Sequence, residues 1–174
     1  SSEHTAVGYR ALYNNTTGQK NTAIGPYSSQ NNTTGSQNVN IGFQSLLTNV
    51  SGWGSVAIGY ASMGNANSST TSQVTGNTAV GFASLYGSSN AVNNTGTANT
   101  ATGYAGLYLN TTGERNVANG YQTLFSNTTG SYSVGIGSEA LKFNTTGTRN
   151  VAIGSDASGK NTIGGYNISM GVGA

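Results

Sequence analysis

A short motif of the form N-x-A-[VI]-G recurs along the whole chain. Most copies follow one another at one constant interval, while the units that begin at Ser55 and Asn77 each carry a five-residue expansion and the unit from Asn150 is shortened. A fixed period of this size is typical of a solenoid, in which every repeat forms one turn that packs on its neighbours. We treat residues 1–174 as one repeat domain, a fragment of a longer fibre, with ten units that begin at positions 4, 21, 38, 55, 77, 99, 116, 133, 150 and 161.

The second, third and fourth places of a unit alternate in character, as in Thr5, Ala6 and Val7. Alternation with period two predicts a short strand in every unit. We expect the β-branched side chains to face the interior and the alanines to face outward, where small side chains let another chain approach. The glycine in the fifth place, Gly8 in the first unit and Gly165 in the last, indicates either a positive φ or close contact with a neighbouring coil.

The remainder of each unit predicts a second strand and a turn. An aromatic residue usually follows the glycine, and a leucine such as Leu12 comes three residues after it. We expect a second short strand here, with the leucine inward. The closing N-T-T-G, as at residues 15–18, is typical of a reversing turn. The predicted fold class is therefore all-β: a parallel β-solenoid, or β-roll, of about ten short coils.

Few residues are available to fill the interior of such a solenoid. Only 30 of the 174 residues are Val, Ile, Leu or Phe, whereas Gly and Asn number 27 and 23. The net charge of +2 and the 6% of charged residues still favour an ordered assembly over a disordered chain. Ordering one unit costs more free energy than burying about three apolar side chains returns. We therefore predict an intimate homo-oligomer.

Three copies of the motif carry a resemblance to a known family. S-V-A-I-G at 55–59, S-V-G-I-G at 133–137 and N-V-A-I-G at 150–154 resemble the head repeats of trimeric autotransporter adhesins. The longer form N-T-A-V-G-Y-x-A-L, closed by N-T-T-G, is similar to repeats in bacteriophage tail fibres and in fibre proteins of predatory and marine bacteria. The resemblance spans nearly the whole chain and implies a left-handed parallel β-roll and a homotrimer about a shared axis. It identifies no receptor-binding residue.

Some units depart from the motif. Thr102 and Asn119 stand where an inward β-branched apolar residue is expected, and Asn40 stands where other units have alanine. The last unit, which we place at Asn161, reads N-T-I-G-G. We expect the coils to be least regular at these positions.

The groups needed for catalysis or metal binding are scarce. The chain has no cysteine, its single histidine is His4, and its four carboxylates, Glu3, Glu114, Glu139 and Asp156, all lie in different units. We therefore expect no enzyme, no cofactor and no metal site. The six basic residues form no patch for nucleic acid, and no apolar run is long enough to insert in a membrane.

Two features are candidate contact sites. Residues in the tenth place of the unit follow the inward leucine, so alternation points them outward, where aromatic rings can either stack on sugars or cover a neighbouring chain. The five-residue expansions around 64–76 and 87–96 should bulge side by side, either as a binding surface or as neutral insertions. Trp53, just before them, is either an exposed anchor or a packed plug. The tenth-place candidates are Tyr13, Leu47, Tyr86, Tyr108 and Phe125, and the loop candidates are Asn65, Asn67, Ser88 and Asn90.

Three functions are compatible with these features. The first is an extracellular trimeric fibre or adhesin segment, on a bacterial surface or a virion, that attaches to a glycan or protein receptor on a target cell. The second is a purely structural shaft or spacer. The third is an ice-binding solenoid, which should show regular T-x-T rows on one strand face; threonine gathers instead in the N-T-T-G turns.

Overall fold

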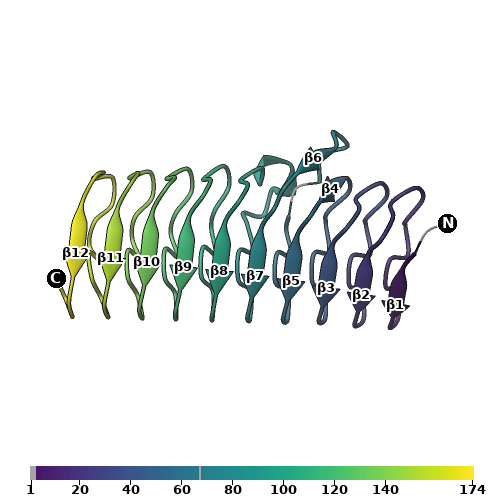
Figure 1. The fold of residues 1–174 in the computed structure, drawn as a ribbon, viewed down its shortest axis with the longest axis horizontal. Coiled ribbons are helices and arrows are strands. Elements are labelled where there is room, and N and C mark those ends of the chain that lie inside the picture. The colour runs from purple at the N-terminus through teal and green to yellow at the C-terminus, as the bar shows by residue number, and fades with distance from the viewer. Residues whose placement is uncertain (1–2, 67) are drawn as a thin grey trace.

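Each repeat unit forms one coil that opens with a three-residue strand. The computed structural model describes residues 3–66 and 68–174. The strands lie side by side in chain order, from the N-terminus at one end of the stack to the C-terminus at the other (Figure 1). At about 4.8 Å per coil, the stack is roughly 45 Å long. The expected parallel β-solenoid of about ten coils is thus confirmed.

The main sheet of the described residues has ten parallel strands. Neighbouring strands share one register throughout, so Ala23 lies between Ala6 and Asn40 of the adjacent strands. The described chain also contains a two-stranded sheet of β4 (Gly52–Trp53) and β6 (Gln73–Val74), and a 3₁₀ turn η1 (Ala91–Asn93). The strands of the main sheet are β1 Thr5–Val7, β2 Thr22–Ile24, β3 Val39–Ile41, β5 Val56–Ile58, β7 Thr78–Val80, β8 Thr100–Thr102, β9 Val117–Asn119, β10 Val134–Ile136, β11 Val151–Ile153 and β12 Ile168–Met170.

The last coil begins later in the chain than the sequence motif indicated. Val151 of β11 pairs with Ile168 of β12, which restores the regular period of the other coils. The unit predicted to begin at Asn161 is therefore wrong. The side-chain amide of Asn161 donates to the carbonyl of Gly164, 2.9 Å away. The first asparagine of the N-T-T-G turns in other coils makes the same hydrogen bond to its own glycine. Gly171, not Gly165, has the positive φ (121°) of a fifth-place glycine.

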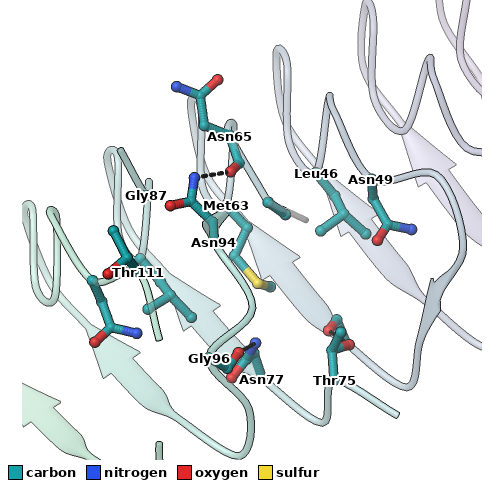
Figure 2. A pocket seen from close by; sticks show the side chains of 14 residues that line it. Leu46, Asn49, Met63, Asn65, Thr75, Asn77, Gly87, Asn94, Gly96 and Thr111 are labelled. Atoms are coloured by element: carbon teal, nitrogen blue, oxygen red, sulfur yellow. Dashed lines mark hydrogen bonds between the residues drawn. The ribbon is translucent and has the colours of Figure 1, made fainter. Parts of the chain in front are cut away.

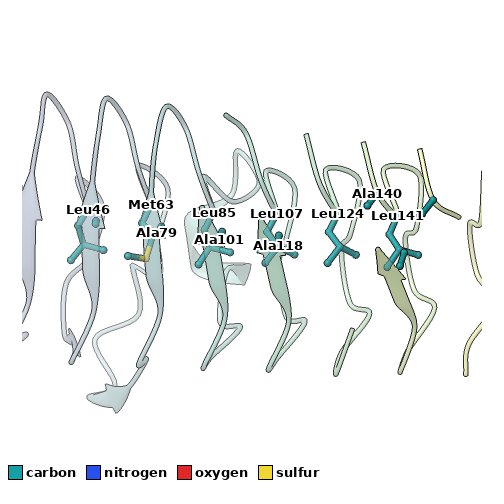
Figure 3. Close-up of a cluster of buried hydrophobic side chains, with 13 residues drawn as sticks. Leu46, Met63, Ala79, Leu85, Ala101, Leu107, Ala118, Leu124, Ala140 and Leu141 are labelled. Carbon is teal, nitrogen blue, oxygen red and sulfur yellow. The ribbon is translucent and has the colours of Figure 1, made fainter. Parts of the chain in front are cut away.

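The two faces of each strand are the reverse of those expected. Apart from Ala6 in the first strand, which is exposed, the alanines point inward and are buried, at 0% exposure in Ala57, Ala79 and Ala101. In contrast, β-branched residues such as Val7 and Ile136 are exposed. Leucines from the opposite wall of the coil reach these alanines and form one continuous core row with them (Figure 3). So short a coil is too narrow to hold both leucine and a second large side chain, and only small residues therefore fit inside the strand.

The reversal explains why Thr102 and Asn119 do not disturb the coils. Both point outward and are solvated, so a polar side chain costs little there. Asn40, in contrast, is fully buried. Its amide donates to the hydroxyl of Ser29 at 2.6 Å, and Ser29 occupies the place that leucine has in other coils. Ser29 is smaller than the leucine of other coils, and Asn40 is larger than the alanine. The two changes compensate each other, so the interior stays filled.

The segment between the fifth-place glycine and the N-T-T-G turn, here called the return segment, is not a strand. Its leucines point inward as expected, but the backbone takes repeated left-handed turns, with φ of 56° at Arg10 and 52° at Leu12. The predicted second strand is therefore wrong. Hydrogen bonds from one coil to the next continue through the segment, for example from the Leu107 amide to the Thr123 carbonyl at 3.0 Å.

The fifth-place glycines meet both conditions that the sequence left open. Gly59 has a φ of 125°, and a Cβ atom at this position would lie 2.4 Å from the carbonyl oxygen of Gly81 in the next coil. Side chains are excluded by backbone conformation and by space alike. The backbones of neighbouring coils therefore approach each other closely at this bend.

Two stacks of buried asparagines run along the interior. In the first stack, the start ladder, the Oδ1 atom of Asn116 accepts from the Ser133 backbone amide at 2.9 Å, and its Nδ2 donates to the Gly130 carbonyl at 2.8 Å. In the second, the turn ladder, Nδ2 of Asn127 donates to Oδ1 of Asn110 at 2.8 Å. The start ladder comprises His4, Asn21, Asn38, Ser55, Asn77, Asn99, Asn116, Ser133, Asn150 and Asn167, and the turn ladder comprises Asn15, Asn32, Asn49, Asn110, Asn127, Asn144 and Asn161.

Removing one rung of the start ladder should destabilise the fold. Asn116→Ala leaves the Ser133 amide buried without an acceptor, so we expect a loss of about 2–3 kcal/mol in the free energy of unfolding. Asn116→Ser should lose less, because Ser133 already accepts the Asn150 amide through its hydroxyl at 3.2 Å. Urea unfolding followed by circular dichroism measures both. Equal losses in the two variants would contradict a role for the hydrogen bond.

Candidate functional site

Aromatic side chains form a row along the outside of the coils, here called the first aromatic row. Neighbouring ring centroids are 5.1–5.7 Å apart; the first two contacts are edge-to-face and the others are stacked. Each ring covers a face of the next, so the row supports the stacking of the coils. Its members are Tyr9, Tyr27, Phe43, Tyr60, Phe82, Tyr104 and Tyr121.

Three of the tenth-place candidates form a second aromatic row. The rings of Tyr86, Tyr108 and Phe125 stack with centroids 5.2 and 5.1 Å apart and interplanar angles of 7° and 2°. All three are partly exposed on the outside of the return segment, as alternation predicted. Their faces are turned toward one another, so a ligand would meet mainly ring edges and hydroxyl groups.

The other two tenth-place candidates do not join this row. Tyr13 lies in the first coil, where its ring is 5.3 Å from the guanidinium carbon of Arg10. Leu47 is separated from Tyr86 by the coil that contains Gly64, and the Tyr86 ring lies against this glycine. The five residues share one place of the repeat in the sequence. In the structure, three of them form a compact group and the other two, Tyr13 and Leu47, lie apart from it.

An open trough of about 430 Å³ lies between the two aromatic rows. Its floor is made by Ala61, Ala83 and Ala105, and Gln44 and Gln122 lie at its two ends. The trough has no charged side chain among its lining residues. Its walls are Tyr60, Phe82 and Tyr104 on one side and Tyr86, Tyr108 and Phe125 on the other.

The pKa of Tyr108 is shifted by its position in the trough. Burial, followed by the proximity of Tyr86 and Tyr104, raises the pKa of its phenol above the ordinary 10.0. Because Tyr104 belongs to the first row and Tyr108 to the second, this coupling extends across the trough. The phenol of Tyr108 therefore stays a neutral hydrogen-bonding group at any physiological pH.

The two expanded coils form one bulge, as expected. The Asn94 side-chain amide donates to the Asn65 carbonyl at 2.6 Å (Figure 2). The Asn65 side-chain amide donates to the Ser88 carbonyl at 3.1 Å. The Ser88 hydroxyl in turn donates to the Asn90 carbonyl at 3.2 Å. Three of the four loop candidates thus hold the bulge together, and Asn67 lies outside the described residues.

Trp53 lies beside this bulge, on the two-stranded sheet of β4 and β6. It pairs with Val74, and the two side chains are 36% and 55% exposed. Trp53 therefore lies at the surface, but most of its side chain is covered. Trp53 and Val74 form a small apolar patch on the side of the rod where Figure 1 shows β4 and β6 projecting from the regular coils.

A small cavity underlies the bulge (Figure 2). It measures about 30 Å³ and lies between Asn49 and Asn110, where the expanded coils interrupt the turn ladder. Asn94 is nearby, but both its side-chain atoms are used to hold the bulge. This volume holds only one or two water molecules, so the cavity is no site for an organic ligand.

The few ionisable side chains of the described residues mostly pair with neighbouring residues. In the described part of the chain, no group of three His, Cys, Asp or Glu side chains could hold a metal ion. His4 is the first rung of the start ladder: its Nδ1 accepts from the Asn21 amide at 3.2 Å, and its Nε2 lies 3.0 Å from the Asn15 amide nitrogen. Glu3, Glu114 and Glu139 pair with basic side chains at the surface.

Comparison with known protein families, with curated proteins and with solved structures finds no match to this chain. Among the described residues, no helix is long and apolar enough to cross a membrane.

The trough could not be found from the sequence by one motif. It requires alanine in the seventh place of three successive units together with aromatic residues in the sixth and tenth places of the same or adjacent units. Each of these features is visible in an aligned repeat. The left-handed turns of the return segment bring the sixth and tenth places to either side of the seventh, on one surface.

The shifted pKa of Tyr108 predicts a loss of stability in alkali. Tyr108 ionises near its ordinary pKa of 10.0 when the chain is unfolded but at higher pH when it is folded, so the free energy of unfolding falls as the pH rises above 10. We expect Tyr108→Phe to lose less stability than the wild type between pH 9 and about 11, as measured by urea unfolding. Identical losses in Tyr108→Phe and the wild type would contradict the assignment.

Proposed function

We propose that this chain is an extracellular segment of a trimeric fibre or adhesin, on a bacterial surface or a virion, that attaches to a glycan or protein on a target cell. One observation carries the proposal. Ten coils in an unbroken register form a rod that exposes an apolar strand face along its length and aromatic rows on another side. Such a rod has little catalytic chemistry but much repetitive contact surface.

The exposed strand face supports self-association. Its outward residues, such as Val7, Ile24, Ile41 and Val80, form two parallel rows of mainly apolar side chains. Large contiguous apolar surfaces of this kind usually mark sites of protein–protein interaction. The partner with the same spacing of rows is another copy of the chain in register. Association would thus use the β-branched face, not the alanine face that the sequence suggested.

The number three and a left-handed roll come from the resemblance to adhesin heads and phage fibres. Three rods packed through their strand faces would bury the apolar rows around a common axis. Each receptor contact would then occur three times on one fibre. Multivalent binding of this kind increases the overall affinity by about 10² to 10⁴ without any new contact.

The alternative functions make different demands on the same surfaces. A pure shaft needs the strand face but gives no role to the trough or to the exposed Trp53. Ice binding needs regular T-x-T pairs on the outward face. Among the ten strands of the main sheet only β8 (Thr100–Thr102) has such a pair, and most of the other outward residues are Val or Ile, which favours burial against protein.

The proposed trimer can be tested with one charge on the strand face. Wild-type protein should sediment with about three times the 17.5 kDa mass of one chain. Ile58→Asp would bring three carboxylates together in the apolar interface, and we expect it to sediment as a single chain. Val74→Asp, on the bulge, is the matched control and should remain trimeric. A wild-type protein that sediments as one chain would contradict the proposal.

Attachment can be tested with the labelled protein on a glycan array and on whole bacterial and eukaryotic cells. We expect saturable binding by the wild type and binding at least about 10²-fold weaker by the single-chain Ile58→Asp variant, because multivalency is lost. A structural shaft should bind to no cell and no glycan. Such a result would leave the spacer as the better interpretation.

A further inference from the structure

The seventh place of the repeat changes character within one part of the rod. Ala61, Ala83 and Ala105 occupy this place in three successive coils, and glutamine follows on both sides, at Gln44 and Gln122. The aromatic walls reach their greatest density beside these alanines. Small floor residues and large wall residues thus coincide over three coils, which produces the trough.

The trough has the dimensions of a ligand site. Three coils span roughly 14 Å along the rod. The volume of about 430 Å³ lies within the range of sites that bind small organic ligands. Because the trough is open and straight, its occupant would be elongated and would lie parallel to the fibre axis.

The lining selects the chemistry of the occupant. No lining residue is charged, which disfavours anionic and cationic ligands. The floor alanines are nearly buried, so the aromatic walls offer most of the apolar contact. Hydroxyl groups of Tyr104 and Tyr108 and the amides of Gln44 and Gln122 both donate and accept hydrogen bonds. The electropositive ring edges suit neutral oxygen atoms. Uncharged sugars, which combine C–H surfaces with many hydroxyl groups, match this lining.

An extended peptide matches it less well. Peptides that bind along a β-structure use free backbone groups of an exposed edge. Here the amides of Ala61, Ala83 and Ala105 already donate to the carbonyls of the preceding coil, each at 2.9 Å. The carbonyls of Tyr86 and Tyr108 accept from the amides of other coils at 3.0 and 2.9 Å.

We propose that the trough between the two aromatic rows binds a short linear oligosaccharide of uncharged sugars. The site deepens the proposed attachment function and rests on it. No residue of the main-sheet strands lines the trough among the described residues. The inward leucines of the return segment face the strand alanines, so the adjacent second row points away from the strand face. Self-association through the strand face would therefore leave the second-row wall of the trough exposed.

The repeat itself supplies a substitution that fills the floor. Ala83 has a φ of 48°, and glutamine occurs in the equivalent place at φ values of 55° in Gln44 and 50° in Gln122. Ala83→Gln should therefore fold normally while blocking the trough. The matched control is Ala98→Gln: Ala98 is exposed in another left-handed turn (φ 56°), and glutamine occurs in its equivalent place as Gln37 (φ 58°).

Binding is measured by titration calorimetry with neutral linear oligosaccharides as probes, namely maltotetraose, cellotetraose and chitotetraose, and with a sialylated tetrasaccharide for comparison. We expect at least one neutral probe to bind the wild type and Ala98→Gln equally, and to bind Ala83→Gln at least tenfold more weakly. The sialylated probe should bind no better than the neutral ones.

Three results would overturn the trough site. The first is that Ala83→Gln still binds the neutral probe, and the second is that the wild type prefers the charged probe. The third is that Ala83→Gln sediments differently from the wild type, which would assign the trough to a second copy of the chain. The attachment function has its own test. If wild type and Ala83→Gln bind cells equally, the trough fails and attachment stands. If a probe binds the trough but no cell binds the protein, attachment fails and the trough stands.

Discussion

The structure depends on the hydrogen bonds that join each coil to the next. A return segment in left-handed turns and a three-residue strand make no ladder of their own, so most of the backbone hydrogen bonds run from one coil to the next. The two asparagine stacks do the same for side chains in the interior, where an unpaired polar group is costly. Each coil is therefore stabilised mainly by its neighbours.

The narrow cross-section has a second consequence. Where leucine fills the coil from one wall, the residue facing it on the strand opposite is small, as at Ala118 and Gly135. The β-branched residues that give the strand its propensity must then face outward, which creates an apolar stripe on a chain that is otherwise polar. Our proposals of self-association and of attachment by repeated contacts both start from this stripe, because burying it within a single coil is sterically excluded.

Differences between the repeats are as informative as their likeness. Asn40 and Ser29 exchange an apolar pair for a hydrogen-bonded one without changing the coil. The alanines of the trough floor, and the bulge fixed by Asn65 and Asn94, alter the outer surface while the ladders beneath continue or are only briefly interrupted. A solenoid of this kind permits local variation of its surface because each coil is held mainly by its neighbours' backbones.

The sequence by itself determined the repeat, the strand in each unit, the inward leucines, the closing turns and the positions of the expansions. Their periodicity is local and can be read from single residues such as Gly59 and Leu107. Only the tertiary structure decided which strand face lies inside. The alternating pattern is compatible with either face pointing inward, and the narrow coil has room only for the smaller side chains. The tertiary structure also decided the place of the last coil, where Asn161 and Asn167 both begin motif-like stretches and only the strand pairing of Ile168 distinguishes them. The trough likewise depends on left-handed turns at Ala61 and Ala83, a backbone conformation that alanine rarely adopts and that the stacked coils impose.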